Sequence, residues 1–201
     1  VYKRQILALG IFMVLPFFLT NLMKGFLPSY SIRTLIEGII RVALFLIYIW
    51  LISKMEDIKR VFMYHGAEHK TINCLEHGED LTPENIKKYS RLHKRCGTSF
   101  LLIVMIVSIV VFMFIRVDSL VWKCVLRILL VPVVAGISYE FIRLAGRSDS
   151  KIVNTLSKPG LYLQYFTTRE PDEEMMEVAI KAVAVSYRHL RAHETELHLV
   201  C

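Results

Sequence analysis

The sequence predicts an all-α, polytopic membrane protein with about four transmembrane helices, a cytoplasmic helical hairpin and a C-terminal cytoplasmic helix. Three observations lead to this fold class. The 201 residues are 54% hydrophobic and 21% charged, whereas soluble domains are about 45–50% apolar and about 25% charged. The apolar residues gather in four long stretches, and most lysines and arginines lie between or after them. This composition also excludes a disordered chain, a coiled coil and a collagen-like fibre.

Each apolar stretch has a length close to that of a membrane span. The four stretches are residues 6–23, 35–52, 100–115 and 125–142. A helix crosses a bilayer with about 20 apolar residues, within a range of about 17–25. Glu37 and Arg41 lie four apart in the second stretch, where they can pair on one helix face. A core helix of a soluble protein is the alternative for any single stretch, but four of them leave too little polar surface to cover such a core.

The distribution of lysine and arginine predicts the orientation of the spans. Nine of these residues lie in 54–98 and eight follow Ile142, against two in 24–34 and three in 116–127. Cytoplasmic loops carry the excess of lysine and arginine, and four spans place 54–98 and the tail on the same side. We therefore expect both to be cytoplasmic. The net charge of +7 fits retained loops, and the sequence shows no nucleic-acid-binding module.

The stretches divide the chain into four parts. Two N-terminal transmembrane helices occupy 1–53, the hairpin 54–98, two further transmembrane helices 99–145, and a tail with one helix 146–201. Within the tail we expect a loop at Lys158-Pro159-Gly160. A helix then starts at Pro171, which is followed by three acidic residues in the first turn.

The segment 54–98 reads as two antiparallel helices. Apolar residues recur near a 3.6-residue period over about Met55–His77, and Gly78 follows as a stop. Thr82 and Pro83 then form a helix start, with threonine as N-cap and proline at the first helical position. The second helix is expected to run to about Arg95. The short connection makes the pair a helical hairpin.

The first helix of this hairpin carries a pattern typical of zinc peptidases. The residues are His65-Gly66-Ala67-Glu68-His69, which match H-x-x-E-H. Two histidines four apart share one helix face, so both rings can reach one metal ion. Glu68 could then take a proton from metal-bound water as the catalytic base. The alternative is a pair of buried, hydrogen-bonded core histidines, because His65 and His69 continue the apolar stripe of their helix.

Three further residues are candidate metal ligands. In a hairpin that turns near 80, His93 lies opposite residue 67, and Cys96 can face the same way. Histidine and cysteine are common zinc ligands. Glu140 ends the fourth stretch, where a carboxylate is costly unless it is paired. It either completes the metal shell or simply pairs with Arg143.

Other polar residues near the pattern have simpler interpretations. Tyr64, Lys70, Asn73 and Arg95 surround the candidate site and could support its ligands or contact a substrate, but solvated side chains are the plainer interpretation. The four cysteines show no disulfide spacing and are expected to be reduced. Cys74 reads as a small core residue.

These residues also carry a resemblance to a known family. The matching positions are Tyr64 to Cys74, Leu81 to Asn85, His93 to Phe100, Ala135 to Glu140, Lys158 to Leu161, Gln164, Thr167 to Pro171 and Glu177 to Ile180. In these, and over nearly all of 6–190, the chain resembles the YqhQ-like family of bacterial membrane proteins. The resemblance implies a multi-pass protein of the bacterial cytoplasmic (inner) membrane, a domain of unknown function and a predicted metal-dependent enzyme. Family members carry a glycine-rich segment before the first span, so a chain that starts at Val1 without it is expected to be a fragment.

Two functional hypotheses follow. The first is a metal-dependent hydrolase that holds a divalent metal, zinc before others, at His65 and His69, with His93, Cys96 or Glu140 completing the shell. The alternative is a non-enzymatic adaptor in which a closed His/Cys site holds a structural metal. The expected partners are the lipid bilayer and either a membrane protein or a second copy of the chain, with no nucleic acid. A transporter ranks lowest, because Ser108 is the only polar residue of the third stretch.

Overall fold

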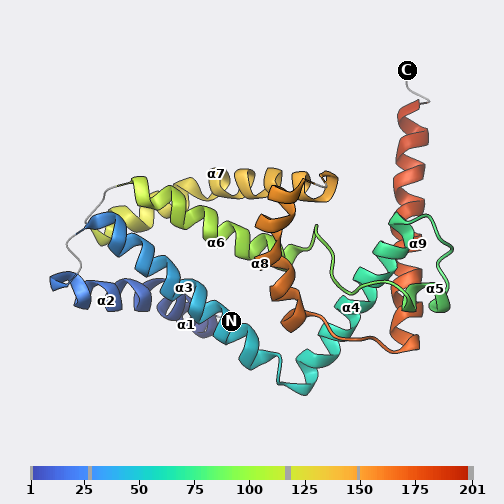
Figure 1. Cartoon of the computed structure of the whole chain (residues 1–201), viewed down its shortest axis with the longest axis horizontal. Coiled ribbons are helices and arrows are strands. Elements are labelled where there is room, and N and C mark those ends of the chain that lie inside the picture. The colour runs from blue at the N-terminus through green and yellow to red at the C-terminus, as the bar shows by residue number, and fades with distance from the viewer. Residues whose placement is uncertain (1, 27–28, 116–118, 149, 199–201) are drawn as a thin grey trace. The chain divides into compact units, whose positions relative to one another are not determined.

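A computed structural model describes residues 2–26, 29–115, 119–148 and 150–198, with side chains up to residue 186 apart from 120, 123 and 124. The described residues form helices and irregular connections and no strand (Figure 1). This confirms the all-α fold class. The chain divides into two compact units, each built from two separate segments. We name Val1–Leu51 with Lys94–Leu163 the span unit, and Ile52–His93 with Gln164–Cys201 the histidine unit.

The span unit contains most of the helical residues. Its helices are α1 (Tyr2–Leu9), the π-helix η1 (Gly10–Val14), α2 (Leu15–Leu22), the 3₁₀-helix η2 (Met23–Gly25), α3 (Tyr30–Ile52), α6 (Gly97–Phe114), α7 (Leu120–Arg147) and most of α8 (Lys151–Thr167). Four stretches are long and apolar enough to cross a membrane: Tyr2–Gly25, Tyr30–Ile52, Gly97–Phe114 and Val125–Arg147. The four predicted spans are therefore confirmed as candidate membrane-spanning helices.

A proline in the first span is accommodated by a partner from the second. Pro16 has no backbone N–H, so it cannot donate to the Phe12 carbonyl one turn earlier. The Arg41 Nε atom donates to that carbonyl instead, at 2.9 Å. The π-helical turn η1 also lies just before the proline, where such bulges adjust the helical ladder. The break thus leaves no orphaned carbonyl at this point.

The histidine unit packs three helices around a small core. These are α4 (Glu56–Glu76), α5 (Pro83–Lys87) and α9 (Glu173–His198). Its buried core consists of Ala67, Cys74, Ile86, Met175, Met176 and Ala179. Gly78 adopts φ +75° after α4, a left-handed conformation that glycine reaches without strain. This confirms the predicted stop of the first helix at Gly78. The Asn85 N–H donates to the Thr82 hydroxyl at 3.3 Å, which confirms Thr82 as the predicted N-cap.

The predicted second helix of the hairpin is much shorter than expected. It ends at Lys87 rather than Arg95, and Gly97 begins α6 instead of ending a helix. The reason lies in the carbonyls that follow, because side chains of α4 take them up. Asn73 Nδ2 donates to the carbonyls of Ser90 and Leu92 at 2.7 and 3.0 Å. These carbonyls already accept hydrogen bonds from a side chain, so they do not require the backbone N–H of the residue four positions later, as they would in a helix. The segment therefore stays irregular.

The loop expected at Lys158-Pro159-Gly160 is also wrong, because these residues lie inside α8. The tail therefore holds two helices, α8 and α9, where one was predicted. A Cβ atom added at Gly160 would lie 2.8 Å from the Cβ of Ser99. This close approach between α8 and the start of α6 fixes the segment as a helix and outweighs the helix-breaking tendency of Pro159 and Gly160.

Candidate metal centre

The helix α4 brings two of the predicted ligands together. The ring centroids of His65 and His69 are 4.3 Å apart, at an interplanar angle of 66°. One ligand nitrogen of each ring lies within 4.8 Å of the other. His69 is 3% exposed and His65 is half-buried. Two imidazoles therefore share one face of α4, as their spacing predicts.

Backbone carbonyls fix the tautomer of both rings. The Nδ1 atom of His65 lies 2.8 Å from the Thr167 carbonyl, and that of His69 lies 2.7 Å from the Arg91 carbonyl. A carbonyl oxygen only accepts hydrogen bonds, so each Nδ1 must carry the proton. In the neutral ring the lone pair is then on Nε2. Histidines that bind a metal ion through one ring nitrogen commonly donate the N–H of the other ring nitrogen to a carbonyl, which orients the ring.

The two carbonyls come from segments far apart in the sequence. The residues 167–169 cross α4 at Gly66, where the Arg169 N–H donates to the Phe62 carbonyl at 2.8 Å. A Cβ atom at Gly66 would lie 2.0 Å from the Arg169 carbonyl oxygen. Glycine at this position therefore permits the crossing that delivers the Thr167 carbonyl to His65.

His93 lies near His69, and its position does not depend on the predicted second helix of the hairpin. Its ring centroid lies 5.8 Å from that of His69. The Gln164 side-chain amide forms two hydrogen bonds with the backbone of His93. The His93 N–H donates to Gln164 Oε1, and Gln164 Nε2 donates to the His93 carbonyl, each at 2.8 Å. The His93 Nε2 atom lies 3.3 Å from both carboxylate oxygens of Glu76. The Glu76 carboxylate therefore holds the ring of His93 in place.

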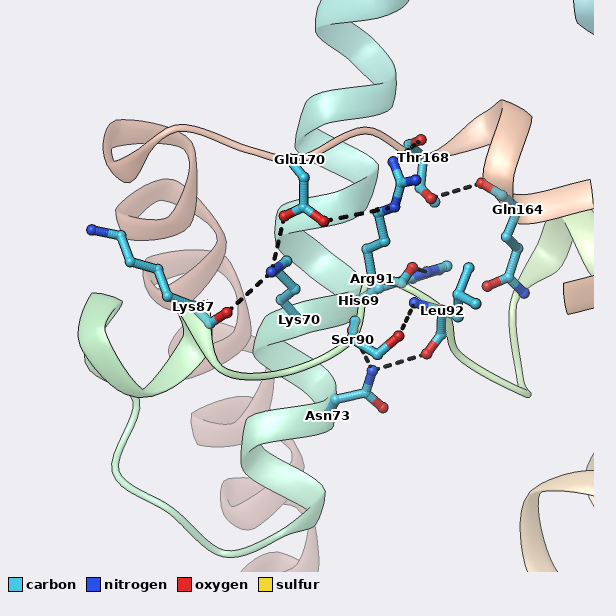
Figure 2. A network of polar contacts seen from close by, with 10 residues as sticks. All are labelled: His69, Lys70, Asn73, Lys87, Ser90, Arg91, Leu92, Gln164, Thr168 and Glu170. Carbon is cyan, nitrogen blue, oxygen red and sulfur yellow. Dashed lines mark hydrogen bonds and ion pairs between the residues drawn. The ribbon is translucent and has the colours of Figure 1, made fainter. Parts of the chain in front are cut away.

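A charged network holds the two carbonyl-bearing segments against α4 (Figure 2). Lys70 Nζ lies 3.0 Å from Glu170 Oε2 and donates to the Lys87 carbonyl at 3.2 Å. Arg91 donates to the Thr168 carbonyl at 2.9 Å, and its Nε atom lies 3.7 Å from the Glu170 carboxylate. Lys70 is 7% exposed, so it is not the solvated side chain that the sequence suggested. Its charge links 87–91 to 167–170, the segments that orient His69 and His65.

Comparison with known proteins agrees with the resemblance seen in the sequence. The family model described as "Protein of unknown function (DUF1385)" matches residues 4–189. The chain belongs to this family. The "Uncharacterized protein YqhQ" of Bacillus subtilis (strain 168) is 42% identical over 173 residues, which cover 86% of this chain and 54% of that protein. The chain thus spans about half the length of this relative. No solved structure matches the chain.

The other three predicted site residues are Glu68, Cys96 and Glu140. Glu68 lies on α4 beside His69 and is exposed. Cys96 and Glu140 belong to the span unit. Cys96 is buried, and its Sγ atom lies 3.2 Å from the Thr98 hydroxyl. Glu140 forms an ion pair with Arg143 at 3.1 Å, which is the simpler of its two interpretations. The roles of these three residues in a metal centre stay predictions.

Two residues that position the site were given no role from the sequence. Glu76 lies seven residues after His69, two turns along the same face of α4, and this spacing could have identified it. Gln164 carries no such signal, because its contact with residue 93 spans 71 positions and depends on the tertiary fold. The same holds for the backbone carbonyls of Thr167 and Arg91.

Cys74 is a core residue, as predicted, and does not belong to the centre. It is fully buried on α4, and its thiol donates weakly toward the carbonyls of Glu79 and Asp80, at 3.9 and 3.7 Å. Burial raises the pKa of the Cys74 thiol above its ordinary value of 9.0. The group therefore stays protonated at neutral pH, whereas a metal ligand has to be a thiolate.

Proposed function

We propose that the histidine unit binds a divalent metal ion, zinc before others, and that the chain acts as a membrane-anchored, metal-dependent hydrolase. His65 Nε2 and His69 Nε2 are the primary ligands, and one of His93, Cys96 or Glu140 completes a shell that leaves a position open for water. One observation carries this proposal. Both α4 histidines donate Nδ1–H to backbone carbonyls, which leaves the lone pairs on two Nε2 atoms one helical turn apart.

The chemistry of the donor set fits a zinc ion. Two nitrogens at about 2.1 Å from one ion are at most about 4.2 Å apart, close to the upper limit of 4.8 Å for the ligand atoms of His65 and His69. The Glu76 carboxylate beside His93 Nε2 is the partner that strengthens a histidine ligand. Cys96 follows His93 by three residues, a reach of about 11 Å at most. Imidazole and thiolate donors together favour zinc over magnesium or calcium.

The hydrolytic role assigns a separate task to Glu68. A bound zinc ion supplies Lewis-acid chemistry, polarising a substrate oxygen and lowering the pKa of water. Glu68 is adjacent to His69 on α4, and its exposed carboxylate is available to accept a proton as general base. The carbonyls of Thr167 and Arg91 hold the imidazoles in one orientation during this step.

A structural metal in a non-enzymatic adaptor is the second candidate. The burial of His69 and His93, 3% and 9% exposed, favours this alternative. A shell of three histidines and Cys96 is complete with four ligands, and closed sites are structural. If Glu140 took the place of Cys96 with one position left to water, the site would be catalytic.

We also propose a location for the protein. The four candidate spans belong to a multi-pass protein of the bacterial cytoplasmic membrane, with the histidine unit and the C-terminus in the cytoplasm. The excess of lysine and arginine in 54–98 and after Ile142 supports this orientation. The packing of α4 against α9 supports it too, because the two helices need the same side and two spans, α6 and α7, lie between them.

Metal content tests the first part of the proposal. Protein purified without chelators is expected to contain about one zinc per chain, and His69→Ala is expected to lose it. His77→Ala is the matched control, because His77 lies at the end of the same helix and its Nδ1 also bonds a backbone carbonyl, that of Asn73 at 2.7 Å, yet it is exposed. Metal-free wild-type protein would contradict both metal hypotheses.

A second variant separates catalysis from structure. Glu68→Gln is expected to keep the metal and to abolish complementation of a strain that lacks the gene. Glu84→Gln, at an exposed position of α5, is expected to complement fully. Full complementation by Glu68→Gln, with its metal retained, would remove the general base and leave the structural alternative.

A further inference from the structure

The span unit contains a cavity of about 850 Å³ that is open on one side. Residues of α1, η1, α3, α6 and α7 line it, and all but four of its lining residues are apolar. The polar ones are Gln5, Arg41, Ser108 and Arg127. Ligand sites in proteins have volumes of about 300–1,000 Å³ and combine an apolar lining with a few placed polar groups. The cavity matches this description.

The two arginines of the cavity share a single carboxylate. Glu37 Oε1 accepts a hydrogen bond from Arg41 Nη2 at 3.0 Å, and Arg127 Nη2 binds the same oxygen. All three side chains are largely buried. The three residues together carry a net charge of +1, and no carboxylate is among the described residues that line the cavity. A cation inside a membrane-spanning unit is costly unless it is neutralised, and it marks a functional site by default.

One donor of this group lacks a partner. The Nε atom of Arg127 is buried and makes no hydrogen bond to any residue that the structure describes. A buried donor without an acceptor costs about 1–3 kcal/mol. The Phe112 ring lies beneath the guanidinium, at 5.5 Å from its carbon to the ring centroid, and fixes its position. An anion in the cavity beside the Arg127 guanidinium would neutralise the net positive charge and accept a hydrogen bond from Arg127 Nε.

The apolar lining has the length of a lipid chain. Along α6 it runs from Phe112 to Phe100, or about 18 Å at the rise of an α-helix. Arg127 and Arg41 lie two and eleven residues after the first residues of their candidate spans, or about 3 and 16 Å along the helices. The arginine end of the cavity thus lies between the membrane surface and the middle of the span.

We propose that this cavity binds an anionic membrane lipid, with its phosphate at Arg41 and Arg127 and a hydrocarbon chain along the apolar lining. The charge of the arginines selects an anion, and the apolar walls select an amphiphile over a small soluble ion. The site uses the membrane-spanning arrangement proposed above and not the metal centre. A chain without zinc can therefore still bind the lipid.

Lipid binding by the purified full chain tests this proposal. The chain in detergent is incubated with phosphatidylglycerol or with phosphatidylcholine of the same acyl chains, and retained lipid is measured by native mass spectrometry. We expect phosphatidylglycerol to be retained and to raise the thermal unfolding midpoint, with phosphatidylcholine retained about tenfold less. Arg127→Gln is expected to lose about tenfold in retention, the effect of one charged hydrogen bond. Arg143→Gln, on the same helix and outside the cavity, is the control.

A filling variant probes the apolar part without touching the charges. Ala135→Phe narrows the cavity and is expected to reduce retention, whereas Ile137→Phe, exposed on the same helix, is not. Arg127→Gln leaves Arg41 paired with Glu37, so the variant is expected to fold. Equal retention of phosphatidylglycerol by wild type and Arg127→Gln would overturn the proposal. Equal retention of the two lipids, or the same thermal shift with inorganic phosphate alone, would do so too.

Discussion

Gly66 shows how one residue determines the geometry of the candidate centre. The Arg169 carbonyl oxygen occupies the position of its missing side chain, and this crossing brings the Thr167 carbonyl to His65. The sequence pattern drew attention to the histidines on either side of this glycine. The glycine itself carried no signal, because the segment that presses on it lies about a hundred residues later.

Substitution of Gly66 by alanine is therefore expected to disturb both packing and metal binding. The added Cβ has to displace backbone, and overpacking of this kind costs about 1–3 kcal/mol. We expect a lower thermal unfolding midpoint and a lower zinc content for Gly66→Ala. Gly136→Ala is the control, because nothing lies within 4 Å of a Cβ added there. Equal midpoints for the two variants would show that the crossing at residue 169 is not a tight constraint.

The buried thiol of Cys74 gives the histidine unit a dependence on alkaline pH. Burial raises its pKa in the folded chain above the ordinary 9.0. As the pH rises, the unfolded chain loses this proton before the folded chain does. The contribution of the neutral thiol to the free energy of unfolding is therefore fully present below the pKa of the unfolded chain and is lost as the pH rises through the raised pKa of the folded chain. We expect the unfolding midpoint to fall as the pH rises above about 9, and to fall less in Cys74→Ala.

Comparison with this variant separates the effect of the Cys74 thiol on the pH profile from that of a neighbouring group whose pKa is also raised. The pKa of Tyr89 is also raised, first by burial and then by its hydrogen bond with Glu79. Tyr89 is still present in Cys74→Ala, so its contribution cancels in the difference. An unchanged pH profile in Cys74→Ala would argue against a buried neutral thiol.

At the scale of elements, the helix α4 carries most of the site and was also the best predicted element. Its apolar period, the stop at Gly78 and the cap at Thr82 are local signals, and the structure confirms each of them. The segment after Lys87 was mispredicted as helix because its conformation depends on Asn73 and His69 side chains of α4. Tertiary hydrogen bonds of this kind leave no periodic trace in the sequence.

The packing of α9 against α4 is expected to carry much of the stability of the histidine unit. Met176 is 1% exposed in the core that contains Ala67 and Cys74. Met176→Ala removes buried apolar volume and is expected to cost about 2–5 kcal/mol. Val178→Ala, two residues on and half-exposed, is expected to cost far less. Hydrogen exchange of α9 amides provides the measurement, and equal exchange rates in both variants would contradict this account of the packing.

At the scale of the whole molecule, hydrophobic length and charge bias predicted the four spans because both are additive along the chain. The structure confirms four candidate spans with bounds close to those expected. The two compact units were not predicted, because each joins segments separated by the other. The charge bias also makes a prediction about orientation, which is independent of the metal.

Fusions at the C-terminus test that orientation. Green fluorescent protein is expected to fluoresce after Cys201, and alkaline phosphatase is expected to be inactive there, because 54–98 and the tail hold most of the lysines and arginines. An active phosphatase fusion and a dark fluorescent fusion would place the histidine unit outside the cytoplasm.

The central claim concerns the imidazoles of His65 and His69, and X-ray absorption at the zinc edge tests it most directly. The account predicts a shell that contains imidazole nitrogens at about 2.0–2.1 Å, with a sulfur at about 2.3 Å only where Cys96 completes it. His69→Ala is expected to remove this spectrum and His77→Ala to preserve it. A shell of oxygen atoms alone, or the same spectrum in both variants, would contradict a metal centre on this face of α4.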